Sequence, residues 1–251
     1  PQIMATAGCD FAPYAERLDI LGIRRDSIQE VENTFTGQCF LTTDLDSNQI
    51  NAFHPGAMSF SHFNRVNEVK EAIELAIVSP DGKQGMQEHC EQLAAAGIPF
   101  ILDPGQGLPM FSKDELLRMI SLASFLTLND YELEMVLSTT GFSLEALQQA
   151  VKVLIVTLGG KGSKIYEAGV CHDIPAVAAD EVLDPTGCGD AYRAGLLYGI
   201  SQGWDWPTIG RLASLLGTIK IATKGGQNHA ISREALAARF EVAFGFALPS
   251  A

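Results

Sequence analysis

One short run of residues, Asp184-Pro-Thr-Gly-Cys-Gly-Asp190, combines the residue types that phosphoryl transfer needs. An apolar helical pattern follows, so we expect a loop that leads into a helix N-terminus. The small residues Gly187, Cys188 and Gly189 would let an anion reach backbone N–H groups that lack intrahelical acceptors. Asp190 could then take a proton from a hydroxyl beside that anion, which is the chemistry of phosphoryl transfer to an alcohol. The same pattern also fits a capping role for Asp190 and a simple tight turn at the glycines.

Other candidate side chains follow directly after predicted strands. Ligands of open α/β sheets bind at the carboxyl ends of the strands, so residues at these positions are expected to meet at one edge of a sheet. These residues are Asp103 after Ile101-Leu102, Asn129 after Leu126-Thr-Leu128, Gly159 after Ile155-Val-Thr157, and Asp184 after Val182.

The elements that would position them alternate between apolar strand-like runs and helical stretches. Repeated βα units predict an α/β fold with a mainly parallel sheet and helices on both faces. Strands are expected over 3–7, 76–79, 99–102, 124–128 and 153–157, with short β pieces in 162–177. Helices are expected over 11–21, 69–75, 83–96, 113–122, 131–138, 144–151, 190–202, 207–223 and 232–244.

The segment from residue 26 to residue 55 has a different texture, with near-alternating polarity. We expect an antiparallel hairpin of strands 36–43 and 49–53 joined by a turn at 44–48. The predicted domains are therefore a main α/β domain, residues 1–25 and 56–251, and a small β lid, residues 26–55. A free edge of this hairpin could also pair with a second subunit as a homodimer contact.

Composition excludes several classes of protein. The 251 residues carry a net charge of −13, which argues against nucleic acid and anionic membranes as partners. The five cysteines show no C-x-x-C pair and indicate free thiols in a reducing cytoplasm. We see no signal peptide, no apolar run that could span a bilayer, no P-loop, no complete dinucleotide fingerprint and no G-x-S-x-G.

With these residues in place, the chain resembles the ribokinase-like family of sugar and nucleoside kinases. The resemblance rests on four ordered matches between residues 103 and 229. They are Asp184-Pro-Thr-Gly-Cys-Gly-Asp190 with Ala191-Tyr-Arg-Ala-Gly195, Asn129-Asp-Tyr-Glu132, Thr157-Leu-Gly-Gly-Lys-Gly162, and Lys224-Gly-Gly226. The hairpin sequence and Asp103-Pro-Gly-Gln106 are most similar to bacterial adenosine-kinase-type members.

The resemblance implies a kinase that uses ATP and Mg²⁺, with K⁺ as a further ion. Asp190 would be the base, and the backbone of Gly187, Cys188 and Gly189 would hold the transferring phosphoryl group. Asp184 and Thr186 would shape a monovalent-cation site with backbone around Gly226. The nucleotide site would include Asn129, Glu132 (holding Mg²⁺ through water), Thr157, Gly159, Gly162, Lys224, Gly225 and Gly226, and the acceptor site Phe53, Asp103, Gln106 and Asp190.

Simpler interpretations of these residues stay open. Asn129 and Glu132 also match a helix N-cap with its box partner. The pair Gly159-Gly160 fits a hairpin turn, and Lys161 fits a solvated turn lysine. Phe53 is expected to stack on a purine, or to be a packing residue of the lid. A sugar acceptor such as ribose or fructose is an alternative to a nucleoside.

One departure from the family concerns the start of the chain. The family begins with a strand that carries an acidic residue and with a G-G-x-x-x-N segment, and neither occurs here. We therefore expect a missing N-terminal portion, or else an incomplete acceptor site. The second case motivates a different class of function, a non-catalytic protein that binds nucleotides or nucleosides. The third hypothesis is an α/β protein whose motifs are only caps and turns.

Overall fold

A six-stranded sheet forms the centre of the molecule in the computed structural model, which describes residues 1–43 and 49–250. The strand order is β10-β9-β8-β7-β6-β5. Strands β5 to β8 run parallel, whereas β9 and β10 are antiparallel to their neighbours. The bounds are β5 Ala76–Val78, β6 Phe100–Leu102, β7 Phe125–Asn129, β8 Val153–Thr157, β9 Ser163–Glu167 and β10 Val170–Ile174.

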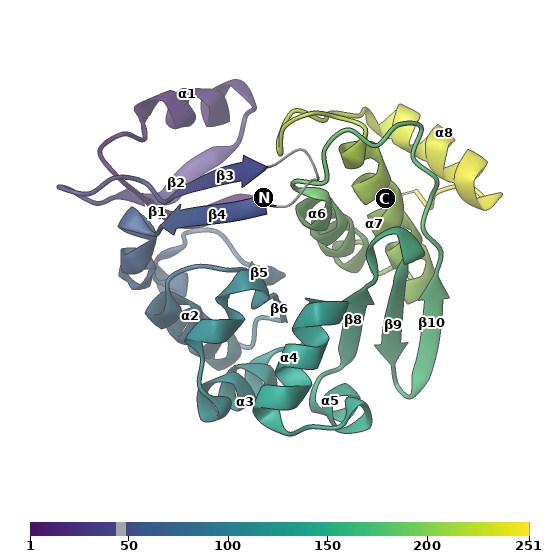
Figure 1. The fold of residues 1–251 in the computed structure, drawn as a ribbon, viewed down its shortest axis with the longest axis horizontal. Helices are drawn as coiled ribbons and strands as arrows, with labels where there is room; N and C mark the ends of the chain where they lie inside the picture. Colours follow the sequence, from purple (N-terminus) through teal and green to yellow (C-terminus); the bar gives the residue numbers. More distant parts are fainter. Residues whose placement is uncertain (44–48, 251) are drawn as a thin grey trace.

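Helices cover both faces of this sheet, as the sequence predicts (Figure 1). The strand residues alternate between the faces: Leu154 and Val156 pack with one group of helices, and Val153 and Ile155 pack with the other. The first group is α2 Lys83–Ala95, α3 Lys113–Leu122, α4 Asp130–Thr140 and α5 Leu144–Ala150, and the second is α6 Cys188–Ser201 and α7 Trp206–Ile221. Helix α8, Arg233–Phe244, packs on α7 through Phe240.

Two smaller sheets precede the main one in the chain. Strand β1, Gln2–Ala7, pairs in parallel with β2, Arg24–Glu30, and helix α1, Ala12–Ile20, connects them. Strands β3, Gln38–Thr43, and β4, Gln49–His54, form the expected antiparallel hairpin, with Cys39 opposite Phe53. The predicted turn at 44–48 lies outside the described residues. Since β2 pairs with β1, the lid assigned to 26–55 includes a strand that belongs to another sheet, and that division stays a prediction.

Two local predictions are wrong. The helix expected over 69–75 is absent; a single 3₁₀ turn, Val66–Glu68, is followed by irregular chain up to β5. Its apolar residues, such as Ile73, pack against the core without helical hydrogen bonds. The strand expected before Asp184 is also absent, since residues 175–187 form a loop. This loop instead receives hydrogen bonds from other parts of the chain, described below.

Candidate active site

Helix α6 begins without a side-chain cap. Its N-cap is Gly187, whose φ of 85° is left-handed, and within the described chain no side chain accepts a hydrogen bond from its first turn. Five other helices, by contrast, are capped by side chains, those of Ser112, Asn129, Ser143, Asp205 and Ser232. The N–H of Cys188 donates to the carbonyl of Pro185 at 3.1 Å, whereas those of Gly189 and Asp190 find no backbone acceptor in the described chain. These N–H groups are available to an anion, which the helix dipole also favours.

Glycine is required at position 187 because two loops meet there. A Cβ atom on Gly187 would lie 2.8 Å from the carbonyl oxygen of Gly226. The loop that enters α6 is therefore packed directly against the loop that leaves α7. The sequence predicted both loops as parts of one site, and the structure brings them together.

Asp190 is the third residue of α6 and is exposed to solvent. It is not the N-cap, so the alternative in which Asp190 only caps the helix is wrong. Its negative charge contributes to raising the pKa values of both Asp103 and Arg193. An exposed carboxylate beside uncapped amides is suited to accept a proton from a bound hydroxyl.

Asp103 lies directly after β6 and is only 3% exposed. Arg193 of α6 donates to it through two nitrogens, with 2.8 Å from Nη2 to Oδ1. Burial raises the pKa of Asp103, and the hydrogen bonds and charge of Arg193 oppose this rise. For Arg193, burial lowers the pKa, but the bonds to Asp103 outweigh it and the pKa is raised.

Sequence reasoning missed Arg193. It stands three residues after Asp190, and residues at this spacing share a face of a helix. Its Nη1 also lies close to the first turn of α6, because a Cβ atom on Gly189 would be only 2.8 Å from it. The structure therefore adds a guanidinium group beside the predicted anion cradle.

Asn129 and Glu132 form a complete capping box at the start of α4. The Asn129 side chain accepts from the backbone of Glu132 at 2.7 Å, and Glu132 accepts from the backbone of Asn129 at 2.8 Å. The capping interpretation is thus confirmed. Glu132 is nevertheless buried, and its pKa is raised by that burial and also by the negative charge of Asp103. A nearby cation would relieve this excess of negative charge.

The predicted nucleotide loop connects β8 to β9. Gly159 to Lys161 form a 3₁₀ turn, so the hairpin-turn interpretation is also confirmed. Gly159 and Gly162 have positive φ values of 56° and 90°. Added Cβ atoms on Gly159 or Gly160 would meet nothing within 4 Å, so this side of the turn is open. The Thr157 hydroxyl, at the end of β8, donates to the carbonyl of Leu128 at 3.4 Å.

Asp184 ties the two loops around Gly187 together. Its Oδ1 accepts from the backbone N–H of Thr186 at 2.9 Å, and its Oδ2 accepts from that of Gly225 at 2.8 Å. These bonds, with a smaller contribution from the charge of Lys220, lower its pKa to about 2. Lys220 is a second residue that sequence reasoning missed, since a lysine in the apolar pattern of α7 carries no motif. Lys224 itself is exposed, and its carbonyl accepts from Asn228.

Phe53 and Gln106, two of the four residues predicted to hold the acceptor, lie on separate elements. Phe53 is on β4 and 55% exposed. Gln106 is exposed on the 3₁₀ helix Gly105–Met110, and within the described chain it makes no hydrogen bond to another predicted site residue. The structure thus leaves both side chains free for a ligand and does not join them.

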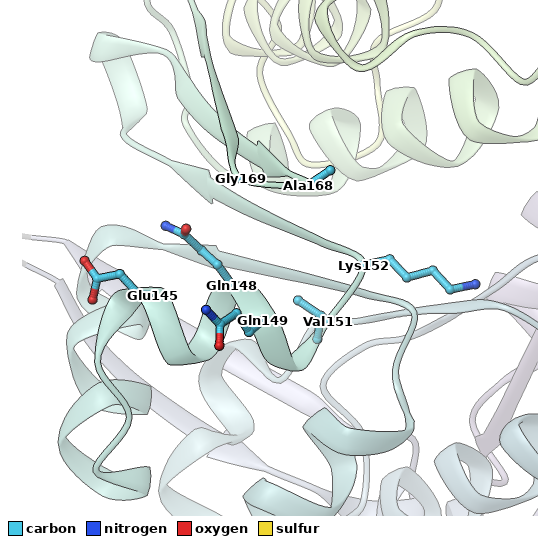
Figure 2. A pocket seen from close by; sticks show the side chains of 7 residues that line it. All are labelled: Glu145, Gln148, Gln149, Val151, Lys152, Ala168 and Gly169. Atoms are coloured by element: carbon cyan, nitrogen blue, oxygen red, sulfur yellow. The ribbon is translucent and has the colours of Figure 1, made fainter.

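A separate pocket lies at the opposite end of the sheet (Figure 2). It is lined by Glu145, Gln148, Gln149, Val151, Lys152, Ala168 and Gly169. Lys152 precedes β8, and Ala168 and Gly169 turn between β9 and β10, so this pocket is at the amino end of β8. The predicted chemistry is at the carboxyl end, where ligands of such sheets bind.

None of the described helices is long and apolar enough to cross a membrane.

The chain is similar to nucleoside kinases in both sequence and structure. The nucleoside kinase of Methanocaldococcus jannaschii is 31% identical over 243 residues, which cover 96% of this chain and 79% of that protein. The structure of Burkholderia thailandensis nucleoside kinase in complex with inosine is 51% identical with a TM-score of 0.95, covering 98% of this chain and 81% of that chain. Its complex with ADP-inosine is 50% identical, also with a TM-score of 0.95, covering 100% and 78%.

A family model gives the same result. The model of the pfkB family of carbohydrate kinases matches residues 3–233, a span that includes every predicted site residue. The resemblance inferred from the four motifs is therefore confirmed. The chain belongs to the pfkB family of carbohydrate kinases, and it is a kinase that phosphorylates a hydroxyl group.

Proposed function

We propose that this protein transfers the γ-phosphoryl group of ATP to the primary hydroxyl of a nucleoside, with adenosine as the favoured acceptor. The observation that carries the proposal is the uncapped N-terminus of α6 with Asp190 in its first turn. The similarity to nucleoside kinases supports a nucleoside rather than a free sugar. One relative is described in complex with inosine, which makes a purine base the natural choice for the acceptor.

In this proposal, the acceptor hydroxyl lies between Asp190 and the anion cradle. Asp190 takes the proton as the hydroxyl oxygen attacks the γ-phosphorus of ATP. The bond from that phosphorus to the bridging oxygen breaks, and ADP leaves. The amides of Gly187, Cys188 and Gly189 receive the negative charge of the transferring group. Arg193, whose Nη1 lies beside Gly189, adds positive charge at the same place. It also holds the carboxylate of Asp103 in one orientation through bonds to both of its oxygens.

The nucleotide would lie along the carboxyl ends of β7 and β8. Thr157 ends β8, Gly159 lies on the open side of the β8–β9 turn, and Gly162 closes that turn. In this proposal Lys224 to Gly226, which pack on the loop before α6, border the nucleotide from the other side. The described residues contain no group of three or more acidic, histidine or cysteine side chains that could hold a metal ion. Glu132 fits Mg²⁺ held mainly by phosphate and water, because its side chain is buried and its carboxylate is repelled by the negative charge of Asp103.

The purine ring of the acceptor nucleoside would stack on Phe53, and Gln106 would form hydrogen bonds to that ring. An exposed aromatic ring on a hairpin strand is a suitable stacking platform. Closure of the β3–β4 hairpin over the acceptor would also exclude water and so suppress hydrolysis of ATP.

The homodimer contact through the hairpin is part of the same proposal. Phe40 is 63% exposed and Ile50 76%, and their pairing partners, Ala52 and Thr42, place them on one face of the hairpin. Phe53 follows Ala52 in strand β4, and successive residues of a strand point to opposite faces. Phe53 therefore lies on the other face of the hairpin. Light scattering on the unaltered protein and on Ile50→Lys checks this contact. A dimer that becomes a monomer in Ile50→Lys supports the contact, and an unaltered protein that is already a monomer contradicts it.

The test of the function is ADP release with Mg·ATP against adenosine, inosine, other nucleosides, ribose and fructose in parallel. Turnover that is fastest on adenosine supports the full proposal. Preference for inosine keeps the nucleoside kinase but replaces the acceptor. Turnover on ribose or fructose makes the protein a sugar kinase. ATP binding without turnover of any acceptor contradicts the proposal and favours a non-catalytic nucleotide-binding protein.

A further inference from the structure

Lys220 is a fully buried lysine in the last turn of α7. Its Nζ donates to two backbone carbonyl oxygens, that of Asp184 at 2.9 Å and that of Thr223 at 3.0 Å. In the described part of the chain, no carboxylate lies within ion-pair distance of this ammonium group. A charged group is costly to bury, so a lysine held by carbonyl dipoles at this position calls for an explanation.

The two carbonyls belong to the loops that build the anion cradle. Asp184 starts the loop that ends at Gly187, the N-cap of α6. Thr223 starts the loop that contains Gly225 and Gly226, and Gly226 packs on Gly187. The ammonium group therefore joins these two loops directly behind the helix N-terminus. Its charge also lowers the pKa of Asp184, after the stronger effects of the Thr186 and Gly225 bonds.

This arrangement conflicts with the monovalent-cation site expected from the sequence. That site required Asp184, Thr186 and nearby backbone carbonyls as oxygen ligands for K⁺. Here both carboxylate oxygens of Asp184 already accept backbone N–H groups, and its carbonyl accepts from Lys220. Backbone carbonyls are the ligands that K⁺ prefers, and an ammonium group is similar to K⁺ in size and charge. A second cation beside it would be repelled.

We propose that Lys220 is a positioning residue that supplies the cation from within the chain, so that phosphoryl transfer by this protein does not depend on K⁺. The inference rests on the proposed kinase function. Lys220 does not touch the reacting atoms. It holds the carbonyls of Asp184 and Thr223 so that the amides of Gly187 to Gly189 stay directed at the transferring group.

The first test uses the unaltered protein with Mg·ATP and its nucleoside in tetramethylammonium buffer, with or without added K⁺ or Na⁺. We expect kcat to agree within about twofold among these buffers. Activation by K⁺ well beyond that factor overturns the proposal. The same assay tests the kinase function separately. If the protein turns over no acceptor in any buffer, this result contradicts the proposed kinase function rather than the proposed role of Lys220.

The second test replaces the lysine. Lys220→Ala leaves space among the carbonyls, so its kcat should fall and then recover about tenfold when K⁺ or NH₄⁺ is added. Lys220→Met fills the same space without charge and should not recover. Lys152→Ala, which removes an exposed lysine at the far end of the sheet, should behave as the unaltered protein. Full activity of Lys220→Ala without K⁺, or no recovery by any monovalent cation, contradicts the proposal.

A third readout does not depend on activity. Potassium should raise the melting temperature of Lys220→Ala relative to tetramethylammonium at equal ionic strength, and it should leave the unaltered protein and Lys220→Met unchanged. Equal shifts in all three proteins would indicate a general salt effect and contradict a vacated cation site. If Lys220→Ala does not fold, the K⁺ response of the unaltered protein still decides the question.

Discussion

Arg193 of α6 and Asp103 at the end of β6 form a buried, two-nitrogen ion pair although they are 90 residues apart. The pair fixes the start of α6 relative to the carboxyl edge of the parallel sheet. It also brings a guanidinium group beside Gly189, where the transferring phosphoryl group is proposed to lie. The same contact therefore joins α6 to the sheet and holds a guanidinium group beside the proposed phosphoryl site, in a protein whose net charge is −13.

Loss of Arg193 should be costly because it leaves a buried carboxylate without its partner. Arg193→Met is expected to lower the free energy of unfolding by about 3–5 kcal/mol, measured by urea denaturation at neutral pH. The control is Arg118→Met, since the ion pair of Arg118 with Glu91 is exposed, and its cost should stay below about 1 kcal/mol. Combining Arg193→Met with Asp103→Asn should recover part of the loss. Equal costs for the two arginines would contradict the role of burial.

Asp190 is predicted to be the general base that takes the proton from the acceptor hydroxyl. Asp190→Asn should reduce kcat by a factor on the order of 10²–10⁴ and leave ATP binding unchanged, because the amide cannot accept the proton but keeps the shape of the side chain. Asp114→Asn, an exposed acid in the first turn of α3, is the matched control and should keep full activity. Kinetics and calorimetric nucleotide binding measure the two effects. Retained turnover in Asp190→Asn would refute this assignment.

Asp184 should make stability depend on acid pH. Its pKa in the folded protein is about 2, below the ordinary value of 3.8, because the N–H groups of Thr186 and Gly225 stabilise the carboxylate. A lowered pKa contributes stability above pH 4 that is lost as pH falls from about 4 to about 2. We therefore expect the stability difference between the unaltered protein and Asp184→Asn to shrink over this interval. Urea unfolding at pH 7, 4, 3 and 2 measures it, and a constant difference would contradict the prediction.

Phe53 should affect acceptor binding more than nucleotide binding. Stacking of a base on an aromatic ring is worth about 1–3 kcal/mol, so Phe53→Ala should raise the KM for the nucleoside about tenfold or more. The KM for ATP should change little. Phe40→Ala serves as the comparison, because Phe40 is similarly exposed but lies on the opposite face of the hairpin. Similar kinetic changes in both variants would indicate packing of the lid rather than stacking.

Gly162 should tolerate no side chain. Its φ of 90° is left-handed, and an added Cβ atom would collide with the carbonyl oxygen of Ile174. Gly169 has a similar φ of 81° with open space around it. Gly162→Ala is therefore expected to lower the free energy of unfolding by more than the roughly 1 kcal/mol expected for Gly169→Ala, where only the backbone conformation is unfavourable. Thermal denaturation compares the two, and equal losses would mean that the collision is relieved by movement of the turn.

Much of the fold follows from local patterns in the sequence. The predicted bounds of α3, 113–122, and of β8, 153–157, agree with the structure. In α3 the capping pair Ser112 and Glu115 marks the start, and in β8 an unbroken apolar run marks a strand buried on both faces. The order of the motifs was likewise enough to identify the family. These signals are local, so they can be read without knowing how the elements pack.

The chemistry behind the motifs was decided by tertiary structure. Nothing near Arg193 in the sequence indicates that Asp103 will be its partner, because their contact depends on how α6 docks against the end of β6. Lys220 lies in an apolar helix, and only the folded loops bring the carbonyls of Asp184 and Thr223 to its ammonium group. The sequence alone determined which residue types stand at the ends of strands and helices. The packing of distant segments determined which charges are buried together, since burial and pairing are properties of the whole fold.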